Sequence, residues 1–176
     1  MFETAYEEKK LLPEGEYECI IKSAFINATN SKSPTEYFSV DFVIRNDVVQ
    51  KYQNKHIFHA IWRKKPEKRT EDDNKVDGFS YKQLMNLCKG AGVPKNTSFK
   101  DFDDLGKYLK GKCCLVTVGH DEWNGNKQVR VKWTNETKFP ECSHKFPVST
   151  NTQTVQTTEP EENDFEPISS DDDLPF

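Results

Sequence analysis

One segment of the chain places aromatic rings directly beside positive charges. Residues 58–62 have the sequence Phe-His-Ala-Ile-Trp, and residues 63–69 continue as Arg-Lys-Lys-Pro-Glu-Lys-Arg. An aromatic ring can stack on a nucleobase while a neighbouring cation contacts phosphate, and this combination is typical of surfaces that bind single-stranded nucleic acid. Each stacked base contributes about 1–3 kcal/mol, and counterion release adds a salt-dependent component. The segment therefore predicts a surface that binds a single-stranded polynucleotide.

Aromatic and basic residues recur in other segments. Some lie at the alternate positions of residues 37–46 that face away from the apolar ones, and some in the connection 51–55. Others lie at the tip of the last predicted hairpin and on one face of the last predicted strand. Periodicity leaves open whether Phe58 and Trp62 face the core or the solvent, whereas Trp133 shares a set with two valines and is expected in the core. The candidate nucleic-acid contacts are Tyr37, Arg45, Lys51, Tyr52, Lys55, Phe58, Trp62, Arg63, Lys64, Lys65, Lys68, Arg69, Trp123, Arg130 and Lys132.

Motifs of catalytic sites are missing from the sequence. It contains no phosphate-binding glycine loop, no dinucleotide fingerprint, no HExxH and no GxSxG. The four histidines have no recognisable metal-ligand spacing, and no two of the five cysteines form a C-x-x-C pair. The acids at 71–73 and 103–104 are the basis for an alternative, a small metal-dependent nuclease, although acids there also suit a loop and a helix N-terminus. We expect no enzyme, no cofactor and no metal, with the cysteines as free thiols.

Charge is divided unevenly along the chain. The sequence has 29 acids and 25 Lys and Arg residues, for a net charge of −4. Residues 149–176 contain eight of the acids and no basic residue, which leaves 21 acids against 25 basic residues in 1–148. The body is therefore +4 and the C-terminal segment −8, a division that suggests a body that binds polyanions.

The last six residues are three acids followed by Leu-Pro-Phe. Such a segment cannot form a core, but it can dock on a protein that offers an apolar pocket for the terminal ring and Lys or Arg for the carboxylates. Ser, Thr, Asn and Gln dominate residues 149–158, a composition typical of a flexible linker. The candidate partner-binding residues are Asp171, Asp172, Asp173, Leu174, Pro175 and Phe176.

Alternating apolar and polar residues predict five strands. These strands cover residues 15–27, 37–46, 55–62, 112–120 and 128–134. In the first of them, Tyr17, Cys19, Ile21 and Phe25 fall on one alternate set. The Asn-Gly pair at 124–125 predicts a hairpin between the last two strands.

A helical pattern interrupts the strands between the third and the fourth. Ser80 is a suitable N-cap, Lys89 and Gly90 suit the C-terminal end, and a shorter helical turn is expected at 101–108. An all-β protein with one main helix in the order β-β-β-α-β-β is predicted to be a five-stranded OB-fold barrel, with a generic α+β sheet as the alternative. We therefore predict an OB-fold domain over residues 1–148, and a linker with a disordered acidic tail over residues 149–176.

Two resemblances follow from these motifs. The closing Asp-Asp-Asp-Leu-Pro-Phe resembles the tail of bacterial-type single-stranded-DNA-binding proteins, in which an OB-fold precedes a polar linker and an acidic tip. The body resembles a family of small phage-encoded single-stranded-DNA-binding proteins. The matching features are Gly15-x-Tyr17, Phe38-x-Val40-x-Phe42, Leu84-x-x-Leu87-Cys88-x-x-x-Gly92 and Leu109-Lys110-Gly111-Lys112.

The resemblance implies a protein that coats and protects single-stranded DNA during phage DNA replication, recombination and repair. It also implies that replication and recombination proteins bind the C-terminal tip, and that copies of the chain associate, although no strand edge in the sequence specifies an oligomer. The alternative is an adaptor whose body binds protein and whose tail binds the host replication machinery. The sequence has no run of about 18 apolar residues and no signal peptide, so we expect no membrane segment and a location in the (host bacterial) cytoplasm.

Overall fold

The computed structural model describes residues 10–147, and the chain divides into two units after Lys145. The predicted linker and acidic tail, residues 149–176, lie outside the described residues, and so does the predicted boundary at residue 148.

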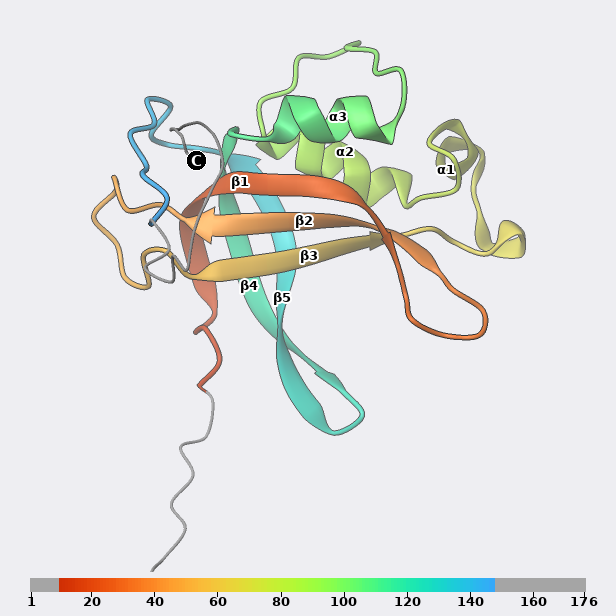
Figure 1. Ribbon diagram of the computed structural model, residues 1–176, viewed down its shortest axis with the longest axis horizontal. Helices are drawn as coiled ribbons and strands as arrows, with labels where there is room; N and C mark the ends of the chain where they lie inside the picture. The colour runs from red at the N-terminus through yellow and green to blue at the C-terminus, as the bar shows by residue number, and fades with distance from the viewer. Residues whose placement is uncertain (1–9, 148–176) are drawn as a thin grey trace, which may run out of the picture. The chain divides into compact units, whose positions relative to one another are not determined.

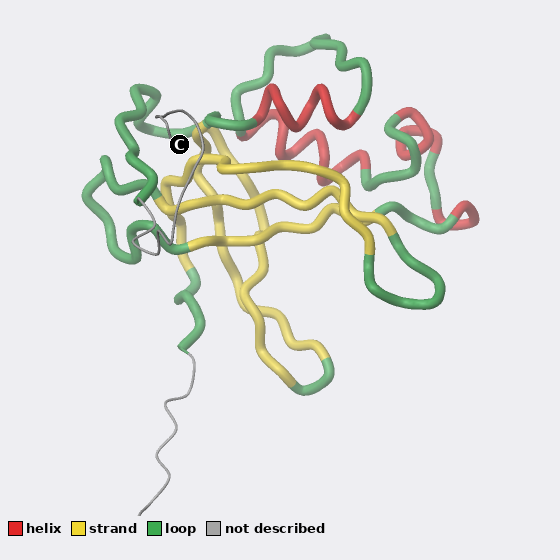
Figure 2. The backbone as a smooth tube through the Cα atoms, in the orientation of Figure 1, coloured by secondary structure: helices red, strands yellow, loops and turns green. Residues whose placement is uncertain are grey.

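Five strands form one antiparallel sheet (Figures 1 and 2). The strands are β1 (Gly15–Ala28), β2 (Glu36–Ile44), β3 (His56–Trp62), β4 (Cys113–Trp123) and β5 (Asn126–Glu136). Their order across the sheet is β3-β2-β1-β4-β5, and in Figure 1 the first three lie in front of β4 and β5. The prediction of five strands, with the helical segment between the third and the fourth, is confirmed.

The core lies on the inner side of this sheet. Phe38, Val40, Phe42 and Ile44 of β2 are fully buried, as alternation along the strand predicts. Buried residues of β3, β4 and β5 face them: Ile57, Ile61, Cys114, Val116, Val118 and Val131. Most of these side chains are β-branched or aromatic, the types that suit a pleated and half-buried surface.

Helical segments connect β3 to β4. They are η1 (Pro66–Lys68), α1 (Glu71–Lys75), α2 (Tyr81–Gly90) and α3 (Phe102–Leu109). Helix α1 forms where a loop was predicted, because Thr70 and Asp73 make a capping box in which each side chain accepts from the other residue's backbone N–H. The prediction of one main helix is therefore incomplete. Within residues 10–147, no helix is long and apolar enough to cross a membrane.

Helices α2 and α3 pack on the sheet through their apolar sides. The Ser80 hydroxyl accepts from the Gln83 N–H at the start of α2, as the sequence predicted. Helix α3 lies against β1, and Gly106 of α3 approaches the Ala24 carbonyl so closely that a Cβ atom would stand 2.2 Å from its oxygen. Glycine is required there because any side chain would overlap the strand.

Strand β1 contains a bulge at Lys22, where its pairing with β2 shifts by one residue. An extra residue reverses the alternation of the side chains that follow it. Ala24 therefore pairs with Val40 of the inner set, and Phe25 pairs with Ser39 of the outer set. The prediction that Phe25 belongs to the inner set is wrong, and Phe25 is 50% exposed.

A second bulge, at Lys132 of β5, has the same effect. Val131 pairs with Val118 on the inner side, but Trp133 pairs with Thr117 of the outer set, so that Lys132 is the extra residue. The prediction that Trp133 lies in the core is therefore wrong, and Trp133 is 47% exposed.

Strands β3 and β5 are the two edges of the sheet. No ladder of hydrogen bonds joins them within the described residues, so the sheet is not closed. They nevertheless approach each other, with Cα atoms of the two strands within 8 Å. The outer side of β5 therefore lies beside the outer side of β3.

His59 lies on the inner set of β3, between Ile57 and Ile61, and its ring centroid is 6.5 Å from that of Phe42. Burial, and in second place the positive charge of Arg130, lower the pKa of His59 from 6.5 to about 4. The folded protein therefore holds this imidazole neutral under conditions in which the unfolded chain would protonate it.

We predict that the folded state loses stability as the pH falls below about 6.5, because the unfolded chain then binds a proton that folded His59 excludes. The loss between about pH 6.5 and pH 5 should reach about 2 kcal/mol, and it should be absent above that range. Urea unfolding at both pH values measures it. His59→Gln, which is neutral throughout, should remove most of the pH dependence, and an undiminished dependence in this variant would contradict the assignment.

Candidate nucleic-acid interface

The outer sides of β1, β2 and β3 form a surface on which side chains lie in rows across the strands. The rows are Asn27–Tyr37–Trp62, Phe25–Ser39–Ala60 and Ser23–Asp41–Phe58. The aromatic residues of these rows are termed the aromatic face: Phe25, Tyr37, Phe58 and Trp62. Phe58 is 66% exposed and Trp62 is 44% exposed. The question that periodicity left open for β3 is thus decided, because Ile57 and Ile61 occupy its inner set.

Tyr37 and Trp62 contact each other at one end of the aromatic face. They are directly opposite in the ladder, with ring centroids 4.8 Å apart and ring planes inclined at 44°. Such a cross-strand aromatic pair restrains both rings. A planar ligand would therefore meet rings that are already ordered, which lowers the entropic cost of binding.

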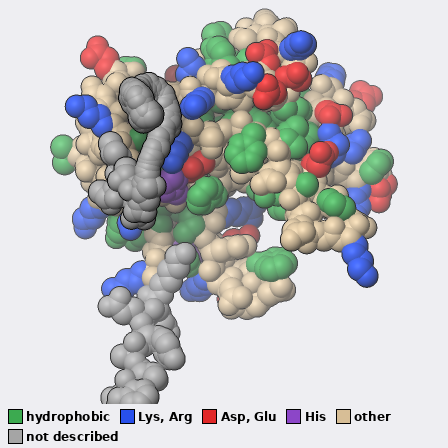
Figure 3. Space-filling model, viewed as in Figure 1, with side chains coloured by type: hydrophobic (Ala, Val, Ile, Leu, Met, Phe, Trp, Pro, Cys, Tyr) green, Lys and Arg blue, Asp and Glu red, His purple; other side chains and the backbone are tan. Residues whose placement is uncertain are grey.

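At the other end, Phe58 lies beside an imidazole and a carboxylate. The rings of Phe58 and His56 are nearly parallel, with centroids 5.7 Å apart. His56 Nδ1 is 2.7 Å from Asp41 Oδ1, and Asp41 is the residue opposite Phe58 in the ladder. Lys55 directly precedes His56, is exposed, and makes no ion pair within the described residues. Figure 3 views the molecule from the side on which β1, β2 and β3 lie and shows hydrophobic side chains at the surface among charged ones.

Arg63, the first basic residue after Trp62, is held within the protein. Its guanidinium pairs with Glu36 and Asp77 and lies over the ring of Phe79, 4.9 Å from the centroid. These contacts fix the end of β3 and the loop that follows it. Arg63 is therefore placed beside the aromatic face mainly by intramolecular partners.

The rest of the basic segment 64–69 divides into held and free cations. Lys64 Nζ lies 3.0 Å from the buried Asp73, and Arg69 Nε donates to the Lys64 carbonyl at 2.8 Å. Lys65 and Lys68 are exposed and make no ion pair or side-chain hydrogen bond within residues 10–147. Of the five basic residues predicted as contacts in residues 63–69, two are thus free to contact a phosphate.

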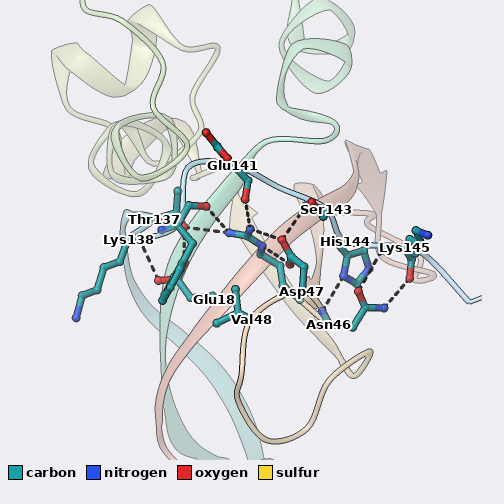
Figure 4. Close-up of polar contacts among 12 residues, drawn as sticks. Glu18, Asn46, Asp47, Val48, Thr137, Lys138, Glu141, Ser143, His144 and Lys145 are labelled. Carbon is teal, nitrogen blue, oxygen red and sulfur yellow. Dashed lines mark hydrogen bonds and ion pairs between the residues drawn. The ribbon is translucent and has the colours of Figure 1, made fainter.

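The structure corrects the expectation for Arg45, which is fully buried. Its guanidinium makes two bonds to Asp47, at 2.8 and 2.6 Å, and donates to Thr137 Oγ1 and to the carbonyls of Phe139 and Glu141 (Figure 4). The hydrogen bond from Arg45 lowers the pKa of Asp47 to about 2. The alternation that placed Arg45 on an outer face fails because β2 ends at Ile44. Arg45 is therefore unavailable to a nucleic acid.

The same network binds the segment 137–145 to the sheet. Glu18, a buried carboxylate of β1, accepts from Thr137 Oγ1 at 2.5 Å and from the Lys138 N–H at 3.1 Å (Figure 4). Farther along, the Asn46 side chain donates to the Lys145 carbonyl at 2.7 Å. The cluster in Figure 4 is thus a structural clasp, and its polar groups bond mainly to one another.

The connection from β2 to β3 contains the other candidates of this region. Lys51 and Tyr52 are exposed, and the Tyr52 ring makes an edge contact with Tyr17, 6.2 Å between centroids. They precede Lys55 in this connection and are therefore farther in sequence from β3 than Lys55 is.

Strand β5 brings further cations beside β3. Arg130 pairs with Asp121 at 3.2 Å, and both side chains are about half exposed. Lys132 is exposed, and its aliphatic stem covers Gly119, where a Cβ atom would meet the stem at 2.1 Å. Trp123 is 67% exposed at the hairpin tip, next to Asn124 and Gly125, whose positive φ angles match a two-residue type I′ turn. The predicted hairpin is confirmed.

The structure thus brings together an aromatic face, of which sequence reasoning identified Tyr37, Phe58 and Trp62. It missed Phe25, because nothing in the residues around Lys22 announces a bulge. Candidate metal sites of three or more His, Cys, Asp or Glu residues are absent from the part of the chain that the structure describes.

Fold and surface define a five-stranded antiparallel β protein with an exposed aromatic face. Residues 3–153 match the family described as Protein of unknown function (DUF669), so the chain belongs to this family. No curated protein matches the chain.

We predict that Arg45→Met lowers the free energy of unfolding by about 3–5 kcal/mol, because it leaves the nearly buried Asp47 without its counter-charge. Arg130→Met, which breaks an exposed pair, should cost less than about 1 kcal/mol. Urea denaturation of both variants measures the difference. Equal small losses would show that the clasp contributes little to folding.

Proposed function

We propose that the protein is a single-stranded-DNA-binding protein, not an enzyme, and that DNA stacks on the aromatic face. The observation that supports this proposal is the exposure of Phe25, Phe58 and Trp62, between 44% and 66%, on one surface together with Tyr37. Burying a large ring is worth about 1.5–3 kcal/mol, so grouped exposed rings favour a binding surface. Stacking on such rings tolerates every base.

The strand order supports the finer proposal that the body is an OB-fold. The order β3-β2-β1-β4-β5, with the edge strands near each other, corresponds to an OB-fold barrel opened between β3 and β5. Such barrels bind oligonucleotides at the face of their second and third strands and at the loops that flank it. Tyr37, Phe58 and Trp62 lie on that face, and Trp123 is the last residue of β4, at the hairpin that leads into β5.

In this proposal the protein coats and protects single-stranded DNA during phage DNA replication and recombination, in the host cytoplasm. Residues 171–176 recruit replication and recombination proteins, a role that rests on their sequence, since they lie outside the described residues. A protein-binding adaptor that uses the same tip is the alternative. The aromatic face favours the DNA-binding protein over the adaptor, because exposed rings lie beside lysines that make no ion pair within the described residues.

Filter binding with oligonucleotides of equal length tests the proposal. We expect the full chain to bind a single strand at least tenfold more tightly than the corresponding duplex, with affinity that falls as salt rises. Quenching of tryptophan fluorescence should accompany binding, since Trp62 lies on the aromatic face. Equal affinity for duplex, or no binding at low salt, would exclude this function and leave the adaptor.

The aromatic face makes a second, residue-level prediction. Phe58→Ala and Trp62→Ala should each weaken single-strand binding by roughly 5- to 100-fold, the equivalent of about 1–3 kcal/mol of lost stacking. Phe139→Ala is the matched control, because Phe139 is 49% exposed but lies on the segment 137–145, away from the rows. An equal loss in the control would show that any exposed ring suffices.

Deletion of Phe176 distinguishes the proposed role of the C-terminal tip from that of the aromatic face. Removing the terminal ring should abolish capture of a replication or recombination protein by the immobilised chain and leave the affinity for single-stranded DNA unchanged. Pull-down and filter binding on the same preparation measure both. Unchanged capture by the shortened chain would contradict a partner-binding role of the tip.

A further inference from the structure

Asp41 lies on β2, the middle strand of the three, at the Phe58 end of the surface that we propose for DNA. Its neighbours across the ladder are Ser23 on β1 and Phe58 on β3, and it is the acidic residue within the three rows. A carboxylate here repels phosphate, so it opposes a surface that works by charge alone. Its position therefore calls for an interaction with a part of the nucleotide other than phosphate.

The carboxylate of Asp41 is fixed in place. Oδ1 bonds His56 Nδ1 at 2.7 Å, and the His56 ring in turn lies parallel to the ring of Phe58, with centroids 5.7 Å apart. The Asp41 side chain is 15% exposed, and its Oδ2 atom has no partner within the described residues. A hydrogen-bond acceptor is thus held next to an exposed stacking ring.

A base that stacks on Phe58 presents its edge to this acceptor. An ionised carboxylate only accepts hydrogen bonds, with about four lone-pair sites on its two oxygens. Guanine offers two adjacent donors on its Watson–Crick edge, N1–H and N2–H. Cytosine and adenine offer one amino group beside an acceptor nitrogen, and thymine places its single N–H between two carbonyls. Guanine is therefore the base whose edge matches Asp41.

We propose that Asp41 reads the base edge at the Phe58 position and favours guanine over thymine. This inference rests on the proposed function and adds a base preference to stacking that otherwise tolerates every base. The group recognised is the pair of N–H donors of guanine. His56 is the positioning residue that orients the carboxylate.

Anisotropy measurements with three labelled oligonucleotides of equal length test the proposal: alternating dG-dT, alternating dI-dT and dT alone. Inosine keeps the purine ring and N1–H but lacks the N2 amino group, so it separates edge recognition from the stronger stacking of a purine. We expect the full chain to prefer dG-dT over dI-dT by about tenfold, the value of one hydrogen bond to a charged group.

Asp41→Asn should remove the preference for dG-dT over dI-dT, because an amide presents a donor as well as an acceptor. Asp103→Asn is the matched control. It makes the same change of charge in an exposed pair with Lys107 on α3, and it should keep the preference. His56→Phe, which keeps a ring beside Phe58 but cannot bond Asp41, should reduce the preference, and it serves as a second variant if Asp41→Asn does not fold.

The outcomes of these measurements distinguish a failure of the role proposed for Asp41 from a failure of the proposed single-strand binding. Equal binding of dG-dT and dI-dT by the unmodified chain, or an equal gain for all three oligonucleotides in Asp41→Asn, would overturn the role of Asp41 and leave single-strand binding intact. The second result would mean that Asp41 only repels phosphate. Failure of the unmodified chain to bind any of the three would overturn the proposed function and this inference with it.

Discussion

Burial of the inner side chains of β2 is the interaction on which the rest of the structure depends. Phe38, Val40, Phe42 and Ile44 are fully buried at every second position, and this fixes which side of β2 faces outward. Since β1 and β3 pair with β2 along its length, their outward residues are determined as well. The aromatic face is therefore the necessary reverse side of the core, and rings on it are exposed because the positions between them are buried.

Two bulges show where sequence reasoning reaches its limit. The five strands, the capped helix at Ser80 and the Asn-Gly hairpin follow from periodicity and turn chemistry, which are local. An extra residue at Lys22 or Lys132 depends on how each strand pairs with its neighbour, and it leaves no pattern within the strand's own sequence. Each bulge turns one aromatic residue, Phe25 or Trp133, from the expected inner set to the outer side. Periodicity could assign the sets of β2 and could not assign those of β1 beyond the bulge.

The candidate cations could be listed from the sequence, but their availability could not. Arg45 binds groups that lie more than 90 residues away, at Thr137, Phe139 and Glu141. Three of the other predicted cations, Arg63, Lys64 and Arg130, have acidic partners in the folded protein. The number of cations counted along the chain therefore overstates the number that a ligand can pair with. The difference is set by tertiary pairing, which a composition cannot contain.

This pairing changes the balance of forces at the proposed surface. The exposed lysines without an ion pair in the described residues that lie on or near it are few: Lys22, Lys55, Lys65, Lys68 and Lys132. Each neutralised phosphate adds a fixed increment to the salt dependence of binding, whereas stacking on a ring adds none. With four rings, five such lysines and the carboxylate of Asp41 among them, the proposed DNA complex would draw a large share of its affinity from stacking. The proposed function therefore implies a surface that favours unpaired bases over duplex, because a duplex offers phosphates but keeps its bases stacked on one another.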